Sequence, residues 1–195
     1  QKTLLEELNR CDILNIPYLV LHPGSRLHED EEICIQRIAT TINIIFETYK
    51  GKTTLLLENA AGQGSSVGYT LEQLSSILHL VKHQHAVGIC FDSCHAHAAG
   101  YDLRTPHLYH TFWKTFDSLI GIKKLKVIHL SNSKKKCGSR VDRHEFIDKG
   151  TMPQTTFSLI MNDPRFVPIP KILETPAIEL SDYAKDMTYL KKLLS

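Results

Sequence analysis

The feature that most constrains the fold is a recurring pair of segments, in which a short apolar run is followed by a stretch with helical periodicity. Five apolar runs occur, at residues 18–21, 54–57, 87–91, 125–128 and 171–173. They are β-branched or aliphatic almost throughout and lack clean alternation, which is typical of strands buried on both faces of a parallel sheet. The pair recurs at roughly 33 to 45 residues, a normal spacing for βα units. The sequence therefore predicts an α/β fold with five consecutive βα units.

The stretches between the runs have helical periodicity. We expect helices over residues 2–15, 30–49 and 71–82, and a further helix that opens at Thr105-Pro106 and is closed by Gly121. Proline is favoured in the first turn of a helix and glycine just after its end. In the second helix, one face carries an apolar stripe made of Cys34, Ile38, Ile42, Ile45 and Tyr49.

Each apolar run ends at, or close to, a side chain that can bind a metal ion. These side chains are His22, Glu58, Asp92, His129 and Glu174. A (β/α)8 TIM barrel carries its chemistry on the loops at the carboxyl ends of its strands, whereas a doubly wound open sheet concentrates its site at one switch point. The five strand ends therefore favour the TIM barrel.

Length limits how much of a barrel can be present. A (β/α)8 barrel typically needs about 250 residues, and the sequence has 195. We therefore expect residues 1–195 to be a single domain that is the carboxyl-terminal portion of a barrel, with five of its eight βα units. About three units are expected to be missing on the amino-terminal side. The sequence is then either a partial gene product or a degenerate relative of a larger enzyme.

Composition excludes several classes of protein. The residues are 42% hydrophobic and 23% charged, and the net charge is only +2, so any affinity for nucleic acid must come from local patches. No apolar run approaches the length of about 20 residues that spans a bilayer, so no membrane partner is expected. Five cysteines without a regular framework indicate a reducing compartment.

Residues 129–144 combine metal-ligand side chains with a basic run. His129, Asp142 and His144 flank this run, which contains Lys134, Lys135, Lys136, Arg140 and Arg143, and Lys123, Lys124 and Lys126 lie just upstream. A lysine run by itself is usually a solvated loop. Metal ligands next to phosphate-binding charge are what hydrolysis of a nucleic-acid backbone requires, so the combination favours that chemistry.

Other candidate ligands are weaker. The pair Asp92 and His95 could serve one metal ion from a single turn, but this spacing alone is a weak signal. We interpret Cys90 and Cys94 as buried cysteines rather than thiolate ligands. A third group of residues has no assigned ligand role, and it contains His28, His79, His83, His85, His97, His107 and His110.

Five blocks of this sequence resemble the endonuclease IV family of zinc-dependent apurinic/apyrimidinic endonucleases. The blocks lie at residues 21–25, 57–64, 91–102, 138–144 and 172–175, and the resemblance runs from about His22 through Glu174. Their order and spacing make the resemblance specific. This sequence departs from the family pattern at three positions. Asn132 stands where the family usually has an acidic residue, Asp148 where it has glycine, and His97 where it has an aromatic residue.

The resemblance implies a site for three zinc ions. His22 and Glu58 would hold the first ion, and Glu58 would bridge to a second ion that is held by three further side chains, Asp92, His129 and Glu174. The third ion would be held by His95, Asp142 and His144. A family site of this kind has one more histidine, which comes from a strand earlier than the one that ends at His22.

The resemblance also implies a function in base excision repair of DNA. A zinc-bound hydroxide would hydrolyse the phosphodiester 5′ to an abasic site in double-stranded DNA and leave a 3′-hydroxyl and a 5′-deoxyribose phosphate. Glu58 and Glu174 would be catalytic, and three basic side chains would contact phosphates: Lys134, Arg140 and Arg143. The protein would be an intracellular monomer, in the cytoplasm of a bacterium or in the nucleus or mitochondrion of a eukaryote.

Two alternatives remain open from the sequence. A metal-dependent sugar isomerase or epimerase could use the same barrel and similar strand-end ligands, although the basic run favours DNA. A non-catalytic fragment that lacks one zinc ligand could retain the second and third zinc sets without cleaving DNA.

Overall fold

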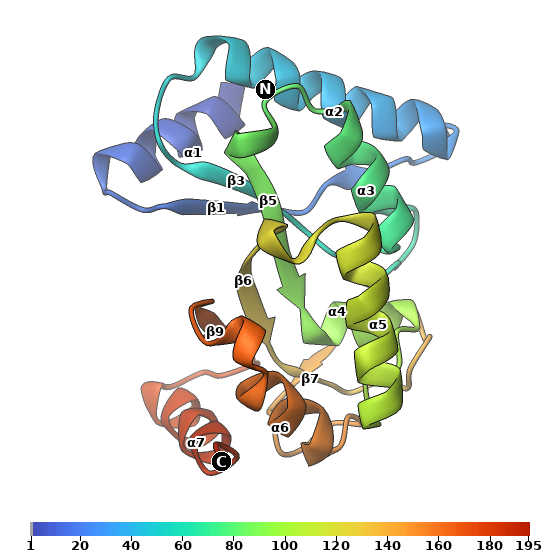
Figure 1. The fold of residues 1–195 in the computed structure, drawn as a ribbon, viewed down its shortest axis with the longest axis vertical. Helices are drawn as coiled ribbons and strands as arrows, with labels where there is room; N and C mark the ends of the chain where they lie inside the picture. The colour runs from blue at the N-terminus through green and yellow to red at the C-terminus, as the bar shows by residue number, and fades with distance from the viewer. Residues whose placement is uncertain (1) are drawn as a thin grey trace.

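A curved sheet of five parallel strands forms the centre of the structure, a computed structural model that describes residues 2–195 (Figure 1). The strands are neighbours in the order in which they occur along the chain, and their bounds are β1 (Tyr18–Leu21), β3 (Thr54–Glu58), β5 (Val87–Asp92), β6 (Leu125–Leu130) and β9 (Lys171–Leu173). Each begins at the predicted residue and ends within two residues of the predicted end. Consecutive parallel strands that pair with one another are the arrangement of a (β/α)8 barrel. The prediction of a partial TIM barrel is therefore confirmed.

The three central strands and the two outer strands differ in burial. Strands β3, β5 and β6 are buried almost throughout, as the continuous apolar runs predict. Strand β1 is only half-buried, and Ile172 of β9 is 50% exposed. Within residues 2–195, β1 and β9 each pair with a strand on one side only. The expectation of burial on both faces was therefore wrong for these two strands.

The predicted helices form close to their expected bounds. They are α1 (Lys2–Ile13), α2 (Glu31–Thr48), α3 (Leu71–Leu80) and α5 (Pro106–Leu119). Each of the last three begins after a side chain that accepts a hydrogen bond from the backbone of the first turn, and these caps are Asp30, Thr70 and Thr105. A cap of this kind stabilises a helix by about 1 kcal/mol. The stripe of α2 packs into the core, with Ile38 only partly buried.

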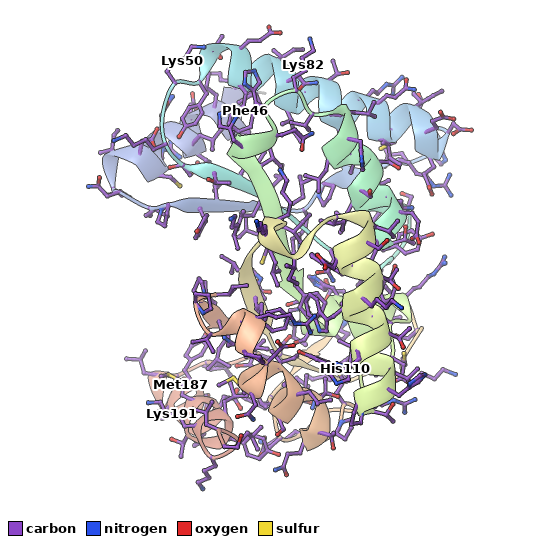
Figure 2. All side chains as sticks on the ribbon, in the orientation of Figure 1. Phe46, Lys50, Lys82, His110, Met187 and Lys191 are labelled. Atoms are coloured by element: carbon purple, nitrogen blue, oxygen red, sulfur yellow. The ribbon has the colours of Figure 1, made fainter. Side chains whose placement is uncertain are left out.

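Three further helices were not predicted from the sequence. They are the short helix α4 (Ser93–Ala99), α6 (Gln154–Asn162) and α7 (Leu180–Lys191). Figure 1 shows α1 beside β1 at one end of the sheet and α7 beside β9 at the other end. Met187 on α7 is 47% exposed (Figure 2).

Two apolar clusters lie on the two faces of the sheet. The larger cluster packs the helices against one face and includes the strand residues Leu57, Phe91 and Ile128. The Phe91 ring packs against two aromatic rings of α5, Phe112 at 5.5 Å and Trp113 at 4.9 Å between centroids. The smaller cluster consists of strand residues only and contains Leu56, Cys90 and Val127, with Tyr18 and Val20 beside them. These positions alternate with the first set along the strands, as the two faces of a sheet require. The smaller cluster is the interior side of the barrel.

Two pairs of two-residue strands lie in the loops that follow the long strands, and single 3-10 turns precede three of the long strands. The two-residue strands β2 (Gly24–Ser25) and β4 (Ser66–Val67) pair with each other, as do β7 (Asn132–Ser133) and β8 (His144–Glu145). Single turns of 3-10 helix precede β5, β6 and β9, at Gln84–Ala86, Ile122–Lys124 and Pro164–Phe166. Within residues 2–195, no helix has the length and apolar character that crossing a membrane requires.

Candidate metal centre

The carboxyl ends of the parallel strands bring together all eight side chains that the sequence predicts as metal ligands. Five of them come from the strands or from the residue that follows a strand: His22, Glu58, Asp92, His129 and Glu174. The other three come from α4, from the loop that follows β7, and from β8: His95, Asp142 and His144. The register of the sheet aligns Glu58 with Cys90, and Asp92 with His129, so that the ends of β3, β5 and β6 coincide.

Glu58 lies at the centre of this arrangement and is only 3% exposed. Its Oε2 is 3.1 Å from His22 Nε2. Its Oε1 is 3.0 Å from His129 Nδ1 and 3.4 Å from His95 Nδ1. One carboxylate therefore contacts three histidines, which come from the residue after β1, from α4 and from β6.

A first ligand group forms around Glu58 and β6. It contains ligand atoms of Glu58, Asp92, His129 and Glu174 that all lie within 4.8 Å of one another. His129 Nδ1 is 3.0 Å from an oxygen of Glu58 and 3.0 Å from Glu174 Oε2, so both carboxylates approach the same ring nitrogen. These four residues are the set that the family resemblance assigns to the second ion.

A second ligand group contains His95, Asp142 and His144, the set assigned to the third ion. The two oxygens of Asp142 are each 3.2 Å from a histidine nitrogen, one on His95 and one on His144. The Nε2 atoms of the two histidines face each other at 3.2 Å. His95 also lies near His22 and Glu58, the residues expected to hold the first ion. It therefore lies between the residues expected to hold the first ion and those expected to hold the third.

Hydrogen bonds on the far side of each ring orient these two histidines. His95 Nδ1 is 3.0 Å from the carbonyl oxygen of Asn59, and His144 Nδ1 is 2.5 Å from the carbonyl oxygen of Glu174. A ring nitrogen next to a carbonyl must carry its proton and donate it, which leaves Nε2 free to bind a metal ion. Both Nε2 atoms are the ones that face Asp142.

The pKa values reflect the crowding of carboxylates and imidazoles. Hydrogen bonds from His144 and His95 hold the pKa of Asp142 well below its usual range. Burial disfavours the charged form of His144, but the neighbouring Asp142 carboxylate outweighs it and raises the pKa of His144 to about 9. Burial raises the pKa of Asp92 to about 6.

The donor set fits divalent transition-metal ions. Imidazole nitrogens combined with carboxylate oxygens are ligands that zinc accepts. Asp92 is fully buried, and its Oδ2 has no hydrogen-bond partner within residues 2–195. A buried, unpaired carboxylate oxygen costs free energy unless it binds a cation or a donor. The structure thus contains groups of residues that could hold metal ions.

The basic loop, residues 134–143, lies beside the centre. Its predicted DNA-contacting residues Lys134, Arg140 and Arg143 are all exposed. The guanidinium of Arg140 lies 4.8 Å from the centroid of the Tyr69 ring. The backbone N–H of Asp142 donates to Gln63 Oε1 at 2.8 Å, which ties the loop to the segment after β3.

The upstream lysines do not join this patch. Lys123 and Lys124 lie in the 3-10 turn before β6, whereas the basic loop follows β7 at the other end of that strand. A strand of six residues extends about 20 Å. Lys124 instead donates to backbone carbonyls at the amino end of the neighbouring strand β5, including that of Val87 at 3.1 Å.

Most of the unassigned histidines lie away from the centre. His107 and His110 are exposed on α5, where Figure 2 labels His110. His79 lies near the end of α3 and is exposed. His97 is the exception, because it is 1% exposed and lies on α4 close to His95.

The structure adds one residue, Asn59, that sequence reasoning did not assign. The side chain of Asn59 accepts from the backbone N–H of Asp92 at 2.7 Å and donates to its carbonyl oxygen at 3.0 Å, so it fixes the end of β5. Asn59 directly follows Glu58 and lies in the block at residues 57–64, which was the sequence signal for this position. Cys90 and Cys94 are both fully buried, as the sequence interpretation expects, and burial raises the pKa of both thiols.

Comparison with known proteins identifies the class. The model of the family described as xylose isomerase-like TIM barrel matches residues 2–193. A relative named "Probable endonuclease 4" from Geotalea daltonii is 48% identical over 174 residues, which are 88% of this chain and 60% of the relative. A second of the same name from Chloroflexus aurantiacus is 44% identical over 191 residues, 97% of this chain and 66% of the relative. The crystal structure of endonuclease IV from Thermus thermophilus matches with a TM-score of 0.81 and 29% identity, covering 97% of this chain and 66% of that one.

The fold and the strand-end centre thus define a xylose isomerase-like TIM-barrel protein. Within this class, the chain belongs to the endonuclease IV family. The chain spans 60 to 66% of the length of these relatives.

Proposed function

We propose that the protein is a zinc-dependent endonuclease that hydrolyses the phosphodiester 5′ to abasic sites in double-stranded DNA and acts in base excision repair. The observation that carries the proposal is the convergence of the two ligand groups, Glu58–Asp92–His129–Glu174 and His95–Asp142–His144, next to an exposed basic loop. The names of the relatives support the same activity. Cleavage would leave a 3′-hydroxyl and a 5′-deoxyribose phosphate.

The centre would hold three zinc ions. His22 and Glu58 would contribute to the first, the group around His129 would hold the second, and the group around Asp142 would hold the third. Zinc ions in such a site lower the pKa of water and neutralise the charge that develops on a phosphoryl group. Glu58 would set the spacing of the first two ions, because its two oxygens face different histidines.

The residues of the chain would also orient the substrate. Glu174 is accessible at the mouth and contacts His129, so its carboxylate can orient the attacking oxygen while it completes the second ligand set. Lys134, Arg140 and Arg143 would contact phosphates that flank the lesion. An abasic sugar has no base to unstack, so extruding it from the duplex costs less than extruding an intact nucleotide.

Cleavage of a labelled duplex with one abasic analogue tests the proposal. The zinc-loaded protein is compared with Glu58→Gln and with Glu72→Gln, which changes an exposed glutamate on α3 away from the centre. We expect incision 5′ to the lesion that is lost in the first variant and kept in the second. Product termini are identified on a denaturing gel.

Zinc binding and turnover of free sugars, measured on the same preparation, separate the alternatives. A chain that binds zinc but does not incise supports the non-catalytic fragment. Turnover of free sugars without incision would support an isomerase or epimerase on the same barrel. The basic loop favours DNA over sugar, because a small neutral substrate gains nothing from three exposed cations.

A further inference from the structure

His97 is a buried histidine that none of the ligand groups uses. It is 1% exposed and lies on α4, two residues after His95. Its Nδ1 has no hydrogen-bond partner within residues 2–195, whereas its Nε2 lies 3.0 Å from Thr151 Oγ1. An aromatic hydrocarbon ring at this position would fill the same space but could not make the contact with Thr151. The histidine therefore adds one specific hydrogen bond to the packing.

The contact with Thr151 continues into the basic loop. Thr151 Oγ1 is 2.7 Å from the carbonyl oxygen of Lys135 and 3.2 Å from that of Ser133. A hydroxyl has one proton, and here a carbonyl accepts it, so the ring N–H of His97 must donate to the hydroxyl oxygen. A continuous chain of hydrogen bonds thus runs from α4 through Thr151 to the start of the loop.

The backbone of α4 holds the middle of the same loop. The N–H of Gly138 donates to the carbonyl oxygen of His97 at 3.0 Å, and the N–H of Arg140 donates to that of Ala98 at 2.9 Å. The N–H of Thr151 donates to the carbonyl oxygen of Ser133 at 2.8 Å. The two sides of the loop are therefore attached to α4 and to the segment around Thr151 at several points, and His97 links the two attachments.

The position of this loop decides where two metal ligands lie. Asp142 is near its end and His144 follows directly in β8, and both must meet His95, which is on α4 itself. We propose that His97, together with Thr151, is a positioning residue that docks the basic loop on α4 and so fixes Asp142 and His144 against His95. The inference rests on the proposed function only in taking these three residues as ligands of one zinc ion.

Zinc affinity, measured without DNA, tests the inference. His97→Phe keeps an aromatic ring and removes the N–H, and Thr151→Val removes the hydroxyl with little change in volume. Thr156→Val is the matched control, because Thr156 is a buried threonine whose hydroxyl donates to Leu103, outside the loop. Competition with a chelating dye gives the dissociation constant of each ion.

We expect one of the ions to bind 10- to 100-fold more weakly in His97→Phe and in Thr151→Val, a typical loss when a residue that orients metal ligands is changed. The other ions and the Thr156→Val control should change little. The double variant should be no worse than Thr151→Val alone, because Thr151→Val already removes the hydrogen bond that His97→Phe removes, together with the bond from the hydroxyl to the loop. His97→Gln, which offers an N–H, should restore most of the affinity.

Unchanged zinc affinity in folded His97→Phe and Thr151→Val overturns the inference, and so does additive loss in the double variant. If His97→Phe does not fold, Thr151→Val and His97→Gln decide the matter by the same measurement. A wild-type protein that binds no ion through Asp142 and His144 overturns both this inference and the proposed metal centre. Weaker binding in the variants together with a wild type that does not incise DNA supports the docking role of His97 and refutes only the endonuclease.

Discussion

At the scale of single residues, one buried carboxylate outside the centre has a testable role in stability. Asp163 is 7% exposed, accepts a hydrogen bond from Tyr109 at 2.9 Å and pairs with Arg165 at 2.5 Å. Burial opposes ionisation of Asp163, but the Arg165 guanidinium outweighs it and holds the pKa of the carboxyl below its usual value. The charged carboxylate therefore links α5 to the turn after α6.

The expected consequence is a pH-dependent loss of stability in Asp163→Asn. Because the pKa of Asp163 is lower in the folded than in the unfolded protein, its stabilisation is complete above the unfolded pKa of about 3.9 and is lost as the pH falls toward the folded pKa. We expect Asp163→Asn to cost about 2 kcal/mol at pH 7, as for hydrogen bonds to a charged group.

Urea unfolding of both proteins between pH 3 and pH 7 measures this effect. The difference in unfolding free energy should narrow as the pH falls below about 4. Asp148→Asn, the same change at an exposed position, serves as the control. A difference that is constant with pH would show that the charge of Asp163 is not what stabilises the fold.

Sequence reasoning could predict which side chains come together where their position at the end of a strand decides it. The eight predicted ligands converge because each follows a parallel strand or lies in a recognisable block, and parallel strands end at one edge. The hydrogen bonds of Asn59 and His97 could not be predicted in this way. They depend on which backbone groups meet across the fold, and no local pattern encodes that.

At the scale of elements, the basic loop should govern how binding of DNA depends on salt. Each phosphate contact that is lost reduces the slope of log K against log salt concentration by about 0.9 for duplex DNA. We therefore expect Lys134→Ala and Arg143→Ala each to lower this slope by about one unit and to weaken binding of all sequences alike. Fluorescence anisotropy with an abasic duplex, in a Glu58→Gln background that does not cleave, gives the slope.

The lysine that lies at the other end of β6 provides the control. Lys123 is also exposed and carries the same charge, but it precedes the strand whose far end carries the loop. Lys123→Ala should leave the slope unchanged. If it lowers the slope as much as Lys134→Ala does, DNA binding is a property of overall charge and the loop has no special part in it.

Elements were predictable where their pattern is long. The helix α2 is 18 residues long, and its stripe and its cap Asp30 fix both its period and its start. The ribbons β2–β4 and β7–β8 are two residues per strand, which is too short for any alternation to show. Helix α4 has only seven residues, and three of them are alanine, so no apolar stripe marks it.

At the scale of the whole molecule, the order of the strands followed from their spacing, because each βα unit returns the chain to the next position of a parallel sheet. The exposure of the two outer strands did not follow, since the apolar runs of β1 and β9 resemble those of the central strands. The burial of a strand depends on how many strands lie beside it, and the apolar run of the strand does not specify that number.

The metal centre should couple the two ends of this sheet, because its ligands come from the residue after β1 at one edge and from the residue after β9 at the other. An ion that binds only the folded chain at 100 times its dissociation constant stabilises it by about 2.7 kcal/mol. For a chain of this size, that is a rise in Tm of about 5–10 °C. We expect a chelator to lower Tm by at least this amount and added zinc to restore it, as measured by differential scanning calorimetry. Asp142→Asn should show a smaller zinc-dependent rise than the wild type, because it loses a ligand of one ion only. A Tm that is independent of zinc in the wild type would contradict this prediction. It would mean that the clustered carboxylates and histidines stabilise the fold through hydrogen bonds and ion pairs with one another, and that no metal ion joins the two edges.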